Sequence, residues 1–180
     1  AQTRASAPLE ATIEAAQRDA LRKAATAPLT VLGADELARL ADEGAAAAAR
    51  LGMTESAAVE LIAGKRDVFA AACKDFLNSP HGAPGSPCPS PVWTCLHCPL
   101  AVFTPTKVPN LLRLRDHLDR QWRALPAPEW LRAYGTAQVR LERDILPRFA
   151  PEVIDAARAE VEADPEPALY LRPEEHPWPS

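Results

Sequence analysis

The feature that most constrains the fold of this 180-residue chain is a group of four cysteines set around a segment rich in proline and glycine. Cys88, Cys95 and Cys98 lie between residues 78 and 109, where neither helical nor strand periodicity is visible, and Cys73 lies just before this stretch. An irregular stretch of this length inside a compact domain needs something besides apolar packing to hold it in place. The clustered thiols therefore suggest a bound metal ion.

Zinc is the metal that this pattern favours. Four thiolates supply the tetrahedral ligand set that Zn²⁺ prefers, and the Cys-x-x-Cys turn from Cys95 to Cys98 places two sulfurs on one ion without backbone strain. Cys73 and Cys88 can complete the set because a long loop separates them. Protein ligands would then fill every coordination position and leave none for water. The spacing predicts a structural zinc centre in the loop over residues 73–109.

Other interpretations of the same cysteines remain open. Four thiols also bind an iron–sulfur cluster, a Cys-x-x-Cys pair also occurs in redox proteins, and cysteines are also found free in apolar cores. The redox interpretation lacks the βαβ context of such pairs. His81 and His97 are further candidate ligands that would replace a cysteine. Because four thiols complete the shell without them, we expect both rings to lie outside it.

Outside the cysteine-rich segment, the sequence predicts an all-α fold of about six helices with an irregular central zinc-knuckle loop. Apolar residues recur at helical spacing, alanine is abundant, and prolines and glycines cluster between the periodic stretches. We find no convincing strand, although residues 92–95 or 101–103 could form short extended pieces beside a metal. Within the domain, helices are expected over residues 35–51, 55–63, 66–77, 110–125, 128–146 and 151–163, with Thr54 as the N-cap of the helix over 55–63. A further helix is expected before the domain, over residues 8–26.

The chain divides into three parts by composition. Residues 1–30 hold an N-terminal helix, residues 31–163 form the helical zinc-binding domain, and residues 164–180 predict an extended acidic, proline-rich tail. The first residue is Ala1 and not methionine, so we expect a processed terminus or a fragment of a longer protein. No signal peptide and no apolar run long enough to span a bilayer is visible. The simplest expectation is a soluble cytoplasmic protein.

Charge is unevenly spread over the chain, whose net charge is −4. Residues 105–150 carry nine basic and five acidic side chains, whereas residues 151–180 carry two basic and eight acidic ones. The basic block can contact the phosphates of duplex DNA, and it can equally be a solvated helix face. The candidate nucleic-acid contacts are Lys107, Arg113, Arg115, Arg120, Arg123, Arg140 and Arg143.

Two weaker patterns suggest chemistry that the surrounding sequence does not support. Residues 48–62 have the order of a helix-turn-helix, but the second helix begins with Glu55 and carries Glu60, which would repel phosphates, so a plain helical hairpin is favoured. His117 and Arg120 match the His-x-x-Arg box of tyrosine recombinases, yet no suitably placed nucleophile or upstream arginine accompanies them. We find no active site and expect that this chain is not an enzyme.

A longer stretch, from Cys73 to about Phe149, resembles the cysteine-rich C-terminal region of integrase-like proteins on mobile elements of high-GC bacteria. The likeness rests on the knuckle Cys95-Leu96-His97-Cys98-Pro99-Leu100-Ala101 and on the step Thr104-Pro105-Thr106-Lys107-Val108-Pro109 into a long helix. The resemblance implies a noncatalytic accessory region beside a tyrosine-recombinase core, or a small partner of one. Any chemistry of site-specific recombination and DNA integration would then lie outside this chain.

Two function classes follow from these observations. The first is a zinc-binding accessory domain that binds DNA or organises the synapse of a recombinase. The second is a protein-interaction or oligomerisation module without nucleic-acid binding, whose basic helices meet acidic partners such as residues 152–175 of a neighbour. In neither class do we expect a membrane or a small-molecule substrate.

Overall fold

The computed structural model describes Arg22, Thr26 and residues 28–164. Apart from Arg22 and Thr26, the predicted helix over residues 8–26 lies outside the described residues, as does the predicted tail beyond Asp164. Within the part of the chain that is described, no helix combines the length and the apolar character needed to cross a bilayer.

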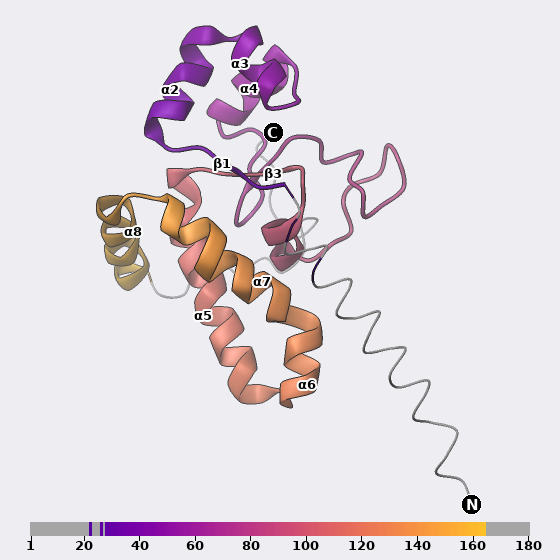
Figure 1. Ribbon diagram of the computed structural model, residues 1–180, viewed down its shortest axis with the longest axis vertical. Helices are drawn as coiled ribbons and strands as arrows, with labels where there is room; N and C mark the ends of the chain where they lie inside the picture. The colour runs from indigo at the N-terminus through magenta and orange to yellow at the C-terminus, as the bar shows by residue number, and fades with distance from the viewer. Residues whose placement is uncertain (1–21, 23–25, 27, 165–180) are drawn as a thin grey trace, which may run out of the picture.

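The fold is mainly helical, and it also contains a small sheet (Figure 1). The strands are β1 (Thr30–Val31), β2 (Ala72–Cys73) and β3 (Ala101–Phe103). The α-helices are α2 (Ala34–Glu43), α3 (Ala45–Arg50), α4 (Glu55–Ile62), α5 (Val108–Ala124), α6 (Ala127–Trp130), α7 (Thr136–Val139) and α8 (Pro151–Ala163). Single 3₁₀ segments span Val92–His97, Pro105–Lys107 and Leu146–Arg148, and π-helical turns span Leu131–Gly135 and Arg140–Ile145.

The sheet corrects the all-α prediction. Its strand order is β1-β3-β2, in which β3 pairs in parallel with β1 and antiparallel with β2, with Cys73 opposite Ala101. Each strand has only two or three residues, which is too short to show an alternating pattern in the sequence. The possible extended piece at 101–103 is confirmed as β3, whereas residues 92–95 belong to a 3₁₀ helix.

Helices α2, α3 and α4 form a three-helix unit at one end of the molecule (Figure 1). The single helix predicted over 35–51 is divided into α2 and α3 because Gly44 adopts a positive φ of 51°, a conformation that few residues other than glycine accept. The predicted N-cap is confirmed, since the Thr54 hydroxyl accepts a hydrogen bond from the Ala57 amide at 3.2 Å. Leu40 and Leu61 of this unit are buried in one hydrophobic cluster with Val102 of the sheet.

The helix predicted over residues 66–77 is wrong. The chain runs instead as turns and a short strand, in which the Cys73 amide donates to the Arg66 carbonyl at 2.8 Å. Four successive residues, from Val68 to Ala71, are all buried in the main core. A helix that lies on a core buries one face only, so a run buried on every side fits an extended or turned backbone better.

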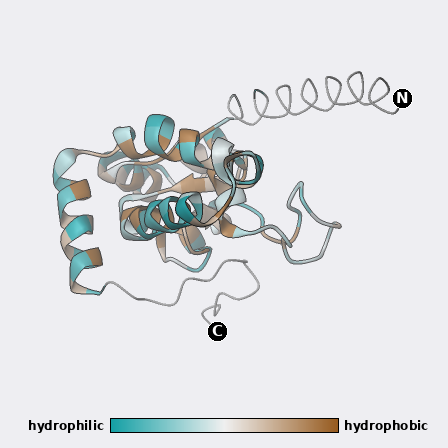
Figure 2. Ribbon diagram, turned by 90° about the horizontal axis from the view of Figure 1, so that it is seen from below, coloured by the Kyte–Doolittle hydropathy of each residue, from teal (hydrophilic) through white to brown (hydrophobic). Residues whose placement is uncertain are grey.

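The remaining helices build the main core beneath the sheet (Figure 1). Helix α5 packs along α8, and the helical stretch from α6 to α7 returns beside it, with the Trp130 indole donating to the Leu118 carbonyl at 2.9 Å. This stretch ends in the 3₁₀ segment that contains Pro147, directly after the predicted end of the helix at residue 146. The predicted bounds of α8 are confirmed, and Figure 2 shows that it carries both hydrophilic and hydrophobic residues.

Candidate functional site

All four cysteines line one small cavity of about 20 Å³. Cys73 is the last residue of β2, Cys95 lies in the 3₁₀ segment Val92–His97, Cys98 directly follows that segment, and Cys88 enters from the proline-rich loop. Cys88 and Cys98 are buried, and the other two are half-buried. The fold therefore brings together side chains that are separated by up to 25 positions in the sequence, as the zinc prediction requires.

Backbone amides lie near two of these sulfurs. The N–H of Asp75 beside Cys73, and those of Leu100 and Ala101 beside Cys98, act to lower the pKa values of these two thiols. The Lys74 amide donates to the Leu100 carbonyl at 2.9 Å, which ties the two turns to each other. Amide donors favour the charged form of a sulfur, so this arrangement suits a thiolate held by a cation.

Burial has the opposite effect on the metal-free thiols. It raises the pKa of Cys73 to about 12 and raises the pKa values of Cys95 and Cys98 as well, and the neighbouring sulfurs add to each increase. Without a cation, these thiols are therefore protonated at neutral pH. A bound cation would remove both the desolvation cost and the repulsion between thiolates, at the cost of releasing the protons.

Among the described residues, no group of three or more His, Cys, Asp or Glu side chains is already arranged to hold a metal ion. The four thiols share a cavity without converging on a single point. Neutral thiols have no reason to converge, and rotation about χ1 moves a sulfur without moving the backbone. The zinc centre thus stays a prediction, supported by the shared cavity and by the amide donors.

The two histidines near the cysteines differ in position. His81 lines the cavity with the cysteines, and burial lowers the pKa of its ring. His97 does not line the cavity, and its buried Nδ1 atom has no hydrogen-bond partner within the described part of the chain. Burial, with the nearby charges of His81 and Arg140, lowers the pKa of His97. Of the two, only His81 is placed to replace a cysteine ligand.

Two of the predicted nucleic-acid contacts are buried side chains and do not lie on the surface as a contact with DNA requires. Lys107 is buried and forms an ion pair with Asp67, and Arg140 is buried and forms an ion pair with Asp144 at 3.0 Å. A sequence shows which residues are charged, but it does not show which of them turn inward to meet a carboxylate.

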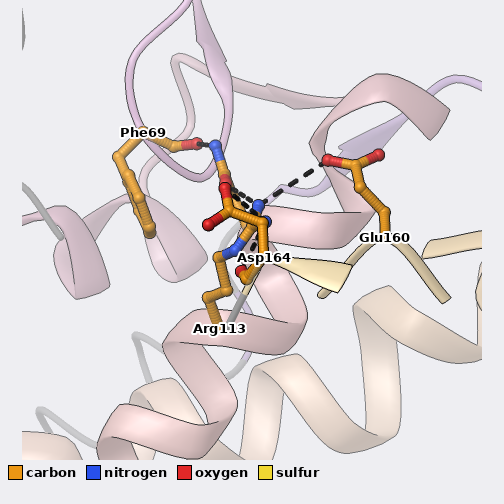
Figure 3. Close-up of polar contacts among 5 residues, drawn as sticks. Phe69, Arg113, Glu160 and Asp164 are labelled. Atoms are coloured by element: carbon orange, nitrogen blue, oxygen red, sulfur yellow. Dashed lines mark hydrogen bonds and ion pairs between the residues drawn. The ribbon is translucent and has the colours of Figure 1, made fainter. Parts of the chain in front are cut away.

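Arg113, a third predicted contact, holds helices α5 and α8 together (Figure 3). Its guanidinium lies 3.7 Å from the Glu160 carboxylate and 3.8 Å from that of Asp164, and it also donates to the Asp164 carbonyl. It donates to the Asn110 side chain at 3.0 Å, and that amide in turn donates to the Phe69 carbonyl at 2.7 Å. The arginine therefore stabilises three segments of the core.

The other four predicted contacts lie nearer the surface. Arg115 lies 3.7 Å from Asp116 and 4.0 Å from Glu142, and exposed Arg143 pairs with Asp144 at 3.1 Å. Arg120 and Arg123 are exposed near the end of α5, and neither forms an ion pair with another described residue within 4.0 Å. These last two arginines are the most available for an external phosphate.

The two weaker sequence patterns receive a structural explanation. The outer side of α4 carries exposed Val59 and Ile62 and has no basic residue, so this helix is poorly suited to phosphates. His117 of the His-x-x-Arg box is buried, with its ring 6.2 Å from those of Trp93 and Tyr134 between centroids. That histidine belongs to an aromatic cluster in the core.

His117 makes the stability of the domain depend on pH. Burial, helped by the positive charge of Arg120, lowers the pKa of His117 below 6.5. The unfolded chain then binds more protons than the folded one, so the stabilising contribution is present above pH 6.5 and is lost as the pH falls towards the folded pKa. When the pH is lowered from about 7.5 to about 5.5, we expect the free energy of unfolding to fall less in His117→Phe than in the wild type. Urea titrations at the two pH values measure this fall. Equal losses in both proteins would contradict this explanation, because the other histidines are common to both.

A scan against protein-family models, a search of curated proteins and a search of solved structures each found no match to this chain.

Proposed function

We propose that this chain is a noncatalytic helical domain held by one structural zinc ion, and that it serves as an accessory DNA-binding or synapse-organising part of a site-specific integrase. The observation that carries the zinc part is that all four cysteines line one cavity, with backbone amides near two of the sulfurs. Cys73, Cys88, Cys95 and Cys98 would hold the ion. Bound zinc supplies a charged cross-link between the proline-rich loop and the core.

The DNA-binding part of the proposal rests on the basic end of α5. Arg120 and Arg123 are exposed there without a carboxylate partner among the described residues, so they can meet phosphates without breaking an internal ion pair. The resemblance of residues 73–149 to the cysteine-rich region of integrase-like proteins gives this surface a role beside a recombinase core.

Neutralising Arg120 and Arg123 together, as Arg120→Gln with Arg123→Gln, is expected to weaken the binding of a short DNA duplex roughly tenfold or more at low salt. The slope of log K against log salt should fall by about 2, since each arginine releases about one counterion. Fluorescence anisotropy over a salt series measures both quantities. Arg158→Gln on α8 is the matched control, because Arg158 is also exposed but lies on another helix. A wild-type chain that shows no duplex binding at low salt would contradict the DNA-binding role.

The second candidate function, a protein-interaction module, is favoured by a different observation. Trp122, Leu131 and Val139 are all about half exposed on α5 and on the α6–α7 stretch. Leu131 lies on the exposed side of its helical stretch, four residues before Gly135. Large apolar side chains exposed on neighbouring helices are typical of a surface that contacts another protein.

A further inference from the structure

A groove of about 500 Å³ lies between the α3–α4 unit and the segment that follows β2. Gly52, Thr54 and Ala57 line it on the helical side, and Lys74 and Asn78 line it on the other. Cys73 lines the cysteine cavity whereas Lys74, the next residue, lines the groove. Successive side chains of a strand point to opposite faces, so the groove and the cysteine cavity lie on opposite sides of the chain at this point.

The charge of the groove comes from Lys74 and Arg66. Lys74 is half-buried, its ammonium donates to the Thr30 hydroxyl at 3.2 Å, and no carboxylate of the described residues lies within ion-pair distance of it. Arg66 pairs with Glu60 at 2.8 Å and donates to the Lys74 carbonyl, so it is fixed against the same wall. The result is a partly desolvated cation that has no carboxylate partner among the described residues, at the edge of an open groove.

One acidic residue also lines the groove. The Asp75 carboxylate accepts hydrogen bonds from the Asn78 side chain at 2.9 and 3.1 Å and keeps its negative charge, so the lining holds two cations, Arg66 and Lys74, and one anion. At the N-terminal end of α4, the Thr54 hydroxyl already accepts the Ala57 amide, so that N–H is not available to a ligand and the charge of the groove is that of its side chains. Gly52, with a φ of 70°, has no atom of the described part of the chain within 4 Å of the position of a β-carbon, which leaves the backbone of this groove residue open to a ligand.

We propose that this groove binds a phosphate group of the DNA backbone, with Lys74 as the main contact. The inference rests on the proposed DNA-binding role and adds a contact to it, on a surface distinct from Arg120 and Arg123. A phosphate oxygen accepts hydrogen bonds from an ammonium and supplies the negatively charged partner that no described carboxylate provides to Lys74. The same chemistry could come from a small phosphorylated molecule, so the test includes inorganic pyrophosphate as a separate probe.

The test compares Lys74→Met with Lys65→Met in the zinc-loaded chain. Methionine keeps the length and apolar character of the lysine stem but removes its charge, and Lys65 is an exposed lysine that does not line the groove. Backbone amide shifts are followed by NMR during titration with a short duplex, and separately with pyrophosphate. We expect shifts at Thr54, Lys74 and Asn78 with the duplex, about tenfold weaker binding for Lys74→Met and a salt slope lower by about 1.

Zinc content is measured for each variant, because Cys98 lies near enough to Lys74 for its charge to influence the ammonium. Duplex binding with shifts confined to α5, or equal losses in the two lysine variants, would overturn the groove inference and leave the DNA-binding role intact. Groove shifts with pyrophosphate but not with the duplex would support a phosphate site and contradict its assignment to DNA. No binding of either probe would overturn both the groove inference and the DNA-binding role.

Discussion

Replacement of Cys95 by serine is expected to abolish stoichiometric zinc binding and to destabilise the whole domain. A serine hydroxyl stays protonated and is a poor zinc ligand, so three sulfurs would be left to hold the ion. Zinc that binds only the folded state stabilises it by about 4 kcal/mol when free zinc exceeds the dissociation constant about a thousandfold. For a domain of this size, that loss lowers the melting temperature by roughly 8–16 °C.

The loss should spread beyond the loop because the walls of the cavity belong to the core. Cys73 lies in the sheet opposite Ala101, and the 3₁₀ segment that carries Cys95 also contains Val92 and Leu96, which are wholly buried. Without the ion, the proline-rich loop has little apolar content of its own to hold these residues in place. Unfolding of the variant should therefore be less cooperative as well as earlier.

Native mass spectrometry measures the zinc content, and circular dichroism during heating measures the stability. Ser90→Ala is the matched control, since Ser90 lines the same cavity but cannot supply a thiolate. We expect one zinc ion per chain in the wild type and in this control, and none in Cys95→Ser. A wild type that carries no metal, or whose melting is unchanged by a chelator, would overturn the zinc centre. An ion with visible absorbance would indicate an iron–sulfur cluster instead.

Helices were predictable where the apolar period was long and its ends were marked. The bounds of α8 agree with the prediction at both ends, and α4 begins after its predicted cap at Thr54. Helix α5 also follows its prediction closely, because prolines delimit the periodic stretch. Over such stretches, local preference and tertiary packing favour the same structure, and a sequence pattern is enough.

The segments around the cysteines were less predictable, for two physical reasons. Residues 68–71 form a short apolar run, and such a run suits a buried helix and a buried extended segment equally well. Strands β2 and β3 exist through their pairing with each other, which is a contact across almost 30 residues that no local pattern records. The shared cavity of the four cysteines was predictable, because the hypothesis of one bound metal ion requires its ligands to meet wherever the chain places them.

The surface charges show a similar division. The count of charged residues along the chain identified a basic block over residues 105–150, and Arg120 and Arg123 are exposed within it. The burial of Lys107 and Arg140 depends on Asp67 and Asp144. Asp144 lies four residues from Arg140, a spacing that could have suggested the pair. Asp67 is forty residues from Lys107, and nothing in the sequence links the two.

Asp67→Ala is expected to destabilise the domain by roughly 3–5 kcal/mol, because it leaves the buried ammonium of Lys107 without a counter-charge. The side chain of Lys107 is only 9% exposed, whereas that of Asp67 is 27% exposed and can be hydrated more easily. Lys107→Met should therefore cost much less, about 1 kcal/mol or below, since the remaining carboxylate reaches water. Urea unfolding of each variant measures these differences.

The double variant Asp67→Ala with Lys107→Met separates a buried charge from a simple loss of packing. If the cost of Asp67→Ala arises from the unpaired ammonium, removing that ammonium should restore most of the lost stability. A double variant as unstable as Asp67→Ala alone would mean that Asp67 acts through the turn it occupies, where it bridges to Ala72. Restored stability would confirm that Lys107 is an internal charge that joins the start of α5 to the turn after α4. Because this lysine is buried, we also expect Lys107→Met to bind duplex DNA as tightly as the wild type.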